Sequence, residues 1–174
     1  MPIIAIDPGP EKSAMVCIDI QQPFETMHWY ADNATIRKEL YSLLFSFPNE
    51  WPVAVVIEQV KSYGMSVGDD VFGTCYASGR FIQVAHDAPG YQTSVYLMPR
   101  RDVKLYLCDS IHATKSNVRR AVLDAYPATG GGATPQKGTK AQPGPLYGVS
   151  GDHKFDALAL ALTYKGDRDR AQLV

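Results

Sequence analysis

The 174-residue sequence predicts an α/β protein built on one mixed five-stranded sheet that is flanked by helices. Three strand-like runs open the chain, separated by short turns with Pro, Gly and Gln, which is typical of an antiparallel meander. Two later apolar runs alternate with helix-like segments, which is typical of strands added in parallel. With 45% apolar residues, the chain can bury a sizeable core, and we expect residues 1–174 to form a single domain.

Each element has a local signal in the sequence. The meander and the two later runs predict strands at 3–7, 13–20, 25–31, 53–59 and 94–98. Apolar residues at helical spacing, together with capping residues and prolines, predict helices at about 33–47, 70–87, 99–107, 115–126 and 152–165. Among these signals, Asp32-Asn33 and Asp69-Asp70 offer helix caps, and Pro99 suits the first turn of a helix.

Composition limits the class of protein. The three cysteines have neither zinc spacing nor a disulfide framework. No run of 18 or more apolar residues occurs, and no basic segment precedes the first strand. We therefore expect no membrane span and no targeting peptide, and a cytoplasmic location. Residues 128–151 are rich in Gly, Pro, Thr and Gln, which predicts a long flexible loop, either functional or disordered.

Charge is unevenly distributed along the chain. Residues 1–99 carry 5 Lys+Arg against 11 Asp+Glu, whereas residues 100–140 carry 8 against 3. The net charge of −1 argues against indiscriminate binding to nucleic acids. The basic segment 100–140 favours a polyanion held on one face of an otherwise acidic protein, with a solvated helix face as the alternative.

Three acidic segments are the most informative feature. Asp7 and Glu58 each end an apolar strand, and His153 and Asp156 lie one turn apart at the start of the last helix. Buried carboxylates are costly unless a cation neutralises them, and oxygen ligands suit Mg²⁺ or Mn²⁺. The alternatives are an ordinary Asp-Pro-Gly turn for Asp7, an ion pair with Lys61 for Glu58, and a helix-dipole role for Asp156.

These segments resemble the RuvC family of Holliday junction resolvases. The resemblance rests on Asp7, on Glu58-Gln59-Val60, and on His153-x-x-Asp156-Ala-Leu-Ala, and it follows the order of elements over nearly the whole chain. It implies a ribonuclease H-like fold and a homodimeric endonuclease that nicks two strands of a four-way DNA junction with divalent metal. The matching positions imply that Asp7, Glu58, His153 and Asp156 are catalytic metal ligands.

The resemblance also implies a role for lysines near the cut strand, which Lys104 and Lys115 match. We predict that Asp7 bridges two ions while Glu58 and Asp156 hold one each. The predicted DNA-binding residues, drawn from the basic segment and from the loop after Glu58, are Arg100, Arg101, Lys104, Lys115, Arg119, Arg120, Lys61 and Tyr63.

The sequence departs from the cellular family at two places. Lys61 stands where the cellular enzymes carry an aromatic residue, with Tyr63 two residues on, and the loop 128–151 is longer than the compact cellular form. Both departures resemble phage-encoded relatives, which act in a bacterial host on a wider range of branched DNA. We expect a nucleoid-associated protein.

Three alternatives to junction resolution remain open from the sequence. A nuclease of the same fold would share the acidic site and cut flaps or RNA–DNA hybrids. A junction-binding protein without catalysis is a second alternative. An actin-like ATPase is the third, although the chain is short for two lobes and lacks a second Asp-x-Gly motif.

Overall fold

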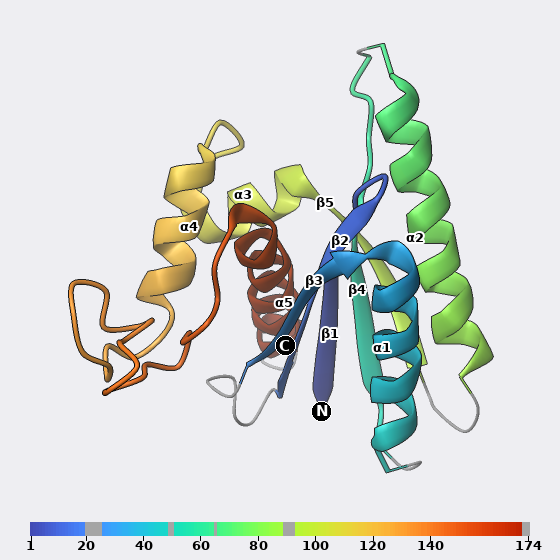
Figure 1. The fold of residues 1–174 in the computed structure, drawn as a ribbon. Coiled ribbons are helices and arrows are strands. Elements are labelled where there is room, and N and C mark those ends of the chain that lie inside the picture. Colours follow the sequence, from blue (N-terminus) through green and yellow to red (C-terminus); the bar gives the residue numbers. More distant parts are fainter. Residues whose placement is uncertain (20–25, 49–50, 65, 89–92, 172–174) are drawn as a thin grey trace.

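The five strands form one mixed sheet in the order β3-β2-β1-β4-β5 (Figure 1). Strands β1, β2 and β3 are antiparallel neighbours, and β4 and β5 are added parallel to β1. The elements in chain order are β1 (Pro2–Asp7), β2 (Lys12–Asp19), β3 (Met27–Asp32), α1 (Asn33–Ser46), β4 (Val53–Gln59), α2 (Asp69–Asp87), β5 (Thr93–Pro99), α3 (Arg100–Cys108), α4 (Lys115–Asp124) and α5 (Asp152–Ala171).

The structure is a computed structural model that describes residues 1–19, 26–48, 51–64, 66–88 and 93–171. Within these ranges it confirms every predicted strand and helix, although α5 runs to Ala171 and not to about 165. Residues 20 and 25 of two predicted strands lie outside the described ranges. The Asp32 carboxylate caps α1 by accepting from the Thr35 amide at 2.9 Å. The predicted cap of α2 was wrong: Gly68 occupies that position, and Asp69 and Asp70 lie in the first turn.

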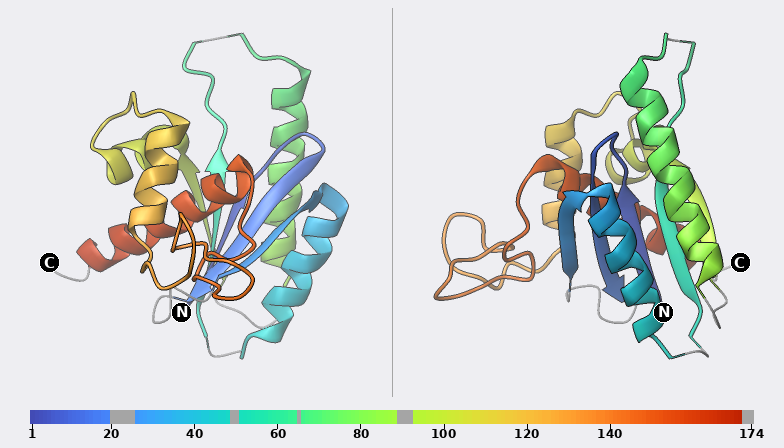
Figure 2. Two further views of the ribbon diagram at one scale, coloured as in Figure 1. Left: turned by 60° about the vertical axis from the view of Figure 1, so that its left-hand side comes forward. Right: turned by 45° about the vertical axis from the view of Figure 1, so that its right-hand side comes forward.

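Helices cover both faces of the sheet (Figures 1 and 2). Alternate residues of each strand point to opposite faces, so each face has its own apolar core. Helices α1 and α2 cover one face, where Ile4 and Val55 of the sheet belong to the same buried apolar cluster as Leu40 and Phe81 of the helices. Helix α5, with α3 and α4 beside it, covers the other face through a second cluster that includes Ile3, Val56, Phe155 and Leu158.

Strand register brings the first two acidic residues together. Ile6 pairs with Ile57 in the parallel β1–β4 ladder. Asp7 and Glu58 follow these partners, so they lie side by side at the carboxyl ends of the two strands. Alternate residues of a strand point to the same face, and Ala5 and Val56, two residues earlier, belong to the core beneath α5. The side chains of Asp7 and Glu58 therefore lie on the α5 face of the sheet.

The same edge also receives the start of α3. Pro99 ends β5 in register with Gln59 of β4, and Arg100 begins α3 immediately afterwards. Proline has no amide hydrogen to donate, so at this position between strand and helix it leaves no backbone donor without a partner. The turn delivers the Arg100 side chain to the same sheet edge as Glu58.

The connection 128–151 is held in place by its own backbone. Leu146 donates its amide to the Gln136 carbonyl, Gly144 donates to Lys137, and the Leu146 side chain is fully buried. A Cβ at Gly138, where φ is +74°, would lie 2.2 Å from the Gly144 nitrogen, so the two segments can approach this closely only with glycine. The sequence-based expectation of flexibility stays a prediction.

The first part of α2 and the segment 60–64 that follows β4 extend beyond the sheet (Figure 2). The inner side of α2 packs closely, since a Cβ at Gly73 would meet the Pro10 side chain at 2.9 Å. Its outer side carries Phe72 and Tyr76, which are 54% and 77% exposed, and Gly79, which has open space around it. Among the described helices, none is long and apolar enough to cross a bilayer.

Candidate active site

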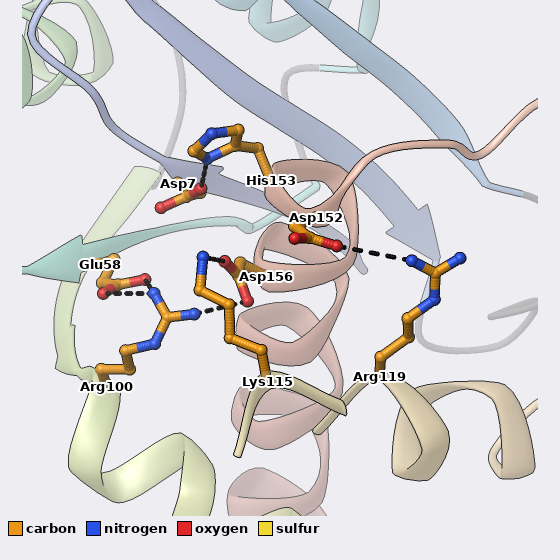
Figure 3. A network of polar contacts seen from close by, with 8 residues as sticks. All are labelled: Asp7, Glu58, Arg100, Lys115, Arg119, Asp152, His153 and Asp156. Atoms are coloured by element: carbon orange, nitrogen blue, oxygen red, sulfur yellow. Dashed lines mark hydrogen bonds and ion pairs between the residues drawn. The ribbon is translucent and has the colours of Figure 1, made fainter. Parts of the chain in front are cut away.

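A histidine and a carboxylate from opposite ends of the chain meet at the carboxyl end of β1 (Figure 3). His153 Nδ1 lies 2.7 Å from Asp7 Oδ2, and Asp7 is 7% exposed. The imidazole stacks on the Tyr30 ring of β3, with centroids 5.4 Å apart and planes 6° apart. The sheet therefore holds Asp7, and an aromatic neighbour on β3 orients His153.

Asp156 lies on the face of α5 that looks toward the sheet edge, one turn beyond His153. Its Oδ1 accepts an ion-pair contact from Arg100 Nη2 at 2.7 Å, and its Oδ2 lies 4.0 Å from Lys115 Nζ. The other arm of Arg100, Nη1, reaches the Glu58 oxygens at 3.4 and 3.5 Å. The ion-pair partner of Glu58 is therefore Arg100. The alternative considered from the sequence, an ion pair with Lys61, was wrong.

Burial dominates the electrostatics of this cluster. The pKa of Glu58 is raised to about 7. Burial is the largest cause, the Arg100 guanidinium opposes it, and the nearby Asp7 and Asp156 charges add to it. The pKa of Asp7 is also raised, chiefly by burial, although the hydrogen bond to His153 lowers it. When all three carboxylates are ionised, the Arg100 guanidinium and the Lys115 ammonium still leave an excess of negative charge, which favours a further cation.

The donor set on the Asp7 side fits a divalent ion. Asp7, His153 and Asp156 each offer a ligand atom, and these atoms lie within 4.8 Å of one another. The two carboxylates suit Mg²⁺ or Mn²⁺, whereas the imidazole also suits other transition metals, so the donor set fits a divalent ion without selecting one. Glu58 is not part of this set, since its oxygens face Arg100. Three of the four predicted ligands are therefore together, and the fourth is beside them in an ion pair.

The predicted basic residues divide into two groups. Lys115, at the start of α4, and Lys104, which lines a small hollow with Glu58 and Asp156, border the acidic cluster. Lys115 is held there by a capping box in which Thr114 and Asn117 satisfy each other's amides. Arg119, one turn further along α4, lies 3.4 Å from Asp152.

The remaining predicted DNA-binding residues lie away from the cluster. Arg120 forms an ion pair at 3.0 Å with Asp124 on its own helix, and Arg101 is exposed on α3. Lys61 and Tyr63 are exposed beyond the end of β4, where Tyr63 has a left-handed φ of 46°. Their DNA contacts stay a prediction.

Sequence reasoning missed two residues and the contacts of a third. Tyr30 carried no signal, because its contact with His153 depends on how the edge strand β3 lies beside α5. Lys137, from the connection 128–151, lies 5.2 Å from the Phe155 ring centre, and Arg119 lies 4.6 Å from the same ring. The contacts of Arg100 with the acidic cluster were not predicted, and its role in binding DNA stays a prediction.

Comparisons with known proteins identify the fold. No family model and no curated protein matches the sequence. Thermus thermophilus RuvC is similar in structure, with a TM-score of 0.64 and 20% identity over 98% of this chain and 97% of that chain. A structure described as T. thermophilus RuvC in complex with Holliday junction substrate matches with a TM-score of 0.65 and 18% identity over 98% and 96%. The chain therefore has the ribonuclease H-like α/β fold of RuvC.

Proposed function

We propose that this protein is a divalent-metal-dependent endonuclease that resolves four-way DNA junctions by paired hydrolysis of phosphodiester bonds. The observation that carries the proposal is the convergence of Asp7, His153 and Asp156 at one sheet edge, bordered by cations from α3 and α4. A similar structure is described with Holliday junction substrate, which supports branched DNA as the substrate class. No described feature favours a flap or an RNA–DNA hybrid over a junction.

In this proposal Asp7, His153 and Asp156 hold Mg²⁺ or Mn²⁺, and Glu58 lies within reach of a second ion. A divalent ion supplies an activated water and relieves charge on the leaving oxygen. The protein contributes fixed geometry, because Asp7 and Asp156 are 7% and 8% exposed and belong to regular elements. Lys115, whose side chain is 60% exposed, can turn its ammonium group from Asp156 to a scissile phosphate.

The cations beyond the cluster would bind the duplex arms. Lys104, Lys115 and Arg119 lie on neighbouring elements that border α5, so a phosphate backbone can follow them. Such contacts position DNA without reading its sequence. Tyr63 and Lys61 lie on the protruding connection after β4, where they can reach unpaired bases at a branch point.

Paired cutting requires two active sites, which a two-fold homodimer would supply. The outer side of α2 suits the dimer contact. Phe72 and Tyr76 are exposed one turn apart, and nothing in the described chain approaches the Gly79 position. A glycine inside a helix costs about 1 kcal/mol relative to alanine, and a second helix that crosses closely at Gly79 would account for it. A phage origin and a nucleoid location stay predictions.

The test is a cleavage panel of four-way junctions, three-way flaps, RNA–DNA hybrids and unbranched duplex, each with Mg²⁺, with Mn²⁺ and with EDTA. We expect metal-dependent nicks at symmetric positions on two opposed strands of the four-way junction. Asp7→Asn is the matched inactive control, which should still bind the junction. Equal cutting of unbranched duplex, or undiminished cutting in EDTA, would contradict the proposal. Preferential cutting of flaps or hybrids would contradict the four-way junction as the substrate but would agree with the proposed metal site.

A further inference from the structure

The Arg100 guanidinium lies between two carboxylates that a second ion would need. Its Nη2 lies 2.7 Å from Asp156 Oδ1 and its Nη1 lies 3.4 Å from Glu58 Oε1. The two carboxylates leave only a small hollow beside the guanidinium, which Lys104 and apolar residues of α3, α4 and α5 also line. A guanidinium and a divalent ion both need these oxygens, so they cannot occupy the place together.

The neighbouring place differs in this respect. Asp7, His153 and Asp156 offer ligand atoms within 4.8 Å of one another, and the Asp7 carboxylate contacts the His153 imidazole rather than a guanidinium. Asp156 belongs to both places, since one oxygen faces Arg100 and the other lies 4.0 Å from Lys115. An ion bound through Asp7 and His153 therefore need not displace Arg100.

We propose that Arg100 acts as a built-in competitor for the second divalent ion: the site binds one ion at Asp7, His153 and Asp156, and accepts another beside Glu58 only when the Arg100 side chain leaves. This inference rests on the proposed metal-dependent function and deepens it by assigning unequal affinities to the two ion places. Arg100 is a positioning residue in this account, because it acts through the carboxylates that it occupies.

DNA provides a destination for the displaced side chain. The Arg100 side chain is 34% exposed, so solvent and ligands can reach it, and its planar fork matches the oxygens of a phosphate as well as it matches carboxylates. A phosphate that draws Arg100 away would free Glu58 and Asp156 at the moment when substrate arrives. The second ion would then bind more tightly in the presence of DNA than in its absence.

The experiment is a titration of Mn²⁺ into the DNA-free protein, followed by calorimetry and by electron paramagnetic resonance. Arg100→Met removes the guanidinium and keeps the apolar stem. Arg101→Met is the matched control, because it removes the same charge from the next residue, which is exposed on α3. For the wild type we expect one ion to bind and a second to bind more weakly.

In Arg100→Met the second ion should bind at least about tenfold more tightly, since charge-assisted hydrogen bonds to Glu58 and Asp156 no longer compete. Arg101→Met should retain the wild-type affinities. Should Arg100→Met fail to fold, Arg100→Lys is the second variant, because it keeps the positive charge and lacks the paired donors of the guanidinium. The second ion should bind several-fold more tightly to Arg100→Lys than to wild type.

Two results separate this inference from the proposed function. If wild type cuts junctions with Mg²⁺ while the Arg100 and Arg101 variants share its second-ion affinity, the competitor role is overturned and the nuclease proposal stands. If no form of the protein binds Mn²⁺ or cuts DNA, both are overturned together.

Discussion

The two halves of the acidic cluster differ in what neutralises their charge. On one side, Asp7 and Asp156 face His153, and their ligand atoms are spaced for a divalent ion. On the other side, Glu58 and Asp156 already hold the two arms of Arg100. The halves share one carboxylate and one sheet edge, yet only the first is arranged as a set of metal ligands.

The difference follows from the elements that supply each half. Asp7 comes from the central strand β1 and His153 from the start of α5, and neither element places an arginine or lysine between these two side chains. Glu58 ends β4 directly beside β5, whose last residue leads into Arg100. The β5–α3 turn therefore inserts a cation where the neighbouring carboxylates converge, and we expect substitutions in the two halves to have unequal consequences.

The largest expected effect separates the halves by activity. Asp7→Asn should abolish junction cleavage, because it removes a buried ligand from the half whose donor atoms are spaced for the ion. Glu58→Gln should leave a reduced but measurable rate, since Asp7, His153 and Asp156 remain. Single-turnover cleavage with Mg²⁺ measures both, and a gel-shift assay confirms that both variants bind the junction. Equal loss in the two variants would contradict a difference between the halves.

Lys115 provides the next largest effect. Lys115→Gln should slow single-turnover cleavage by about a hundredfold, as expected for loss of one preorganised donor to developing charge. Junction affinity should change only a few-fold, because a single phosphate contact is lost. The matched control is Lys140→Gln, an exposed lysine on the connection 128–151. An unchanged cleavage rate in Lys115→Gln would remove this residue from the reaction.

Stability against pH tests the Glu58 half without any catalysis. The pKa of Glu58 is raised by burial from 4.5 to about 7, so between these values the folded protein holds a proton that the unfolded chain has lost. The contribution of Glu58 to stability is therefore full below pH 4.5 and is lost as pH rises through about 7.

Glu58→Gln cannot ionise, so it should not show this loss. Urea unfolding in EDTA at pH 5 and pH 8 should give a fall in stability for wild type that exceeds the fall for Glu58→Gln by up to about 3 kcal/mol. Identical pH dependence of the two proteins would show that Glu58 does not hold its proton in the fold.

The smallest expected effect concerns the connection 128–151. Lys137 and Arg119 lie at 5.2 and 4.6 Å from the Phe155 ring, and both burial and the Arg119 charge lower the pKa of Lys137. A DNA phosphate bound beside Lys137 and Arg119 would offset the repulsion between their positive charges. Lys137→Gln should reduce the slope of log K against log salt for junction binding by about one, and Lys140→Gln should reduce it less. If wild type and Lys137→Gln gave the same slope, Lys137 would not contact DNA.

Much of the fold could be predicted because strand and helix periods are local properties. The run Val53–Gln59 is a buried strand in the sequence and in the structure, and the apolar spacing after Asp32 gave α1 its predicted extent. Asp7, Glu58 and Asp156 could be grouped because strand ends and a helix start each produce a recognisable pattern. Helix ends were harder to predict, since α5 continues to Ala171, beyond the predicted end at 165.

Side-chain partners across distant elements could not be read from the sequence. Arg100 was one of several arginines in a basic segment, and only the β4–β5 register shows that it faces Glu58. The stacking of Tyr30 on His153 likewise joins β3 to α5 across more than a hundred residues. Lys137 belongs to a glycine-rich connection whose conformation depends on backbone contacts at Gly138 and Gly144, for which composition gives no pattern.

The central claim is that carboxylates far apart in the chain form a binding place for divalent ions. Its most direct test is a calorimetric titration of Mn²⁺ into wild-type protein and into Asp7→Asn, at a pH above the raised pKa of Glu58. The account predicts saturable binding of at least one ion by wild type and loss of that ion in Asp7→Asn. Equal binding by both proteins, or no binding by wild type, would contradict it.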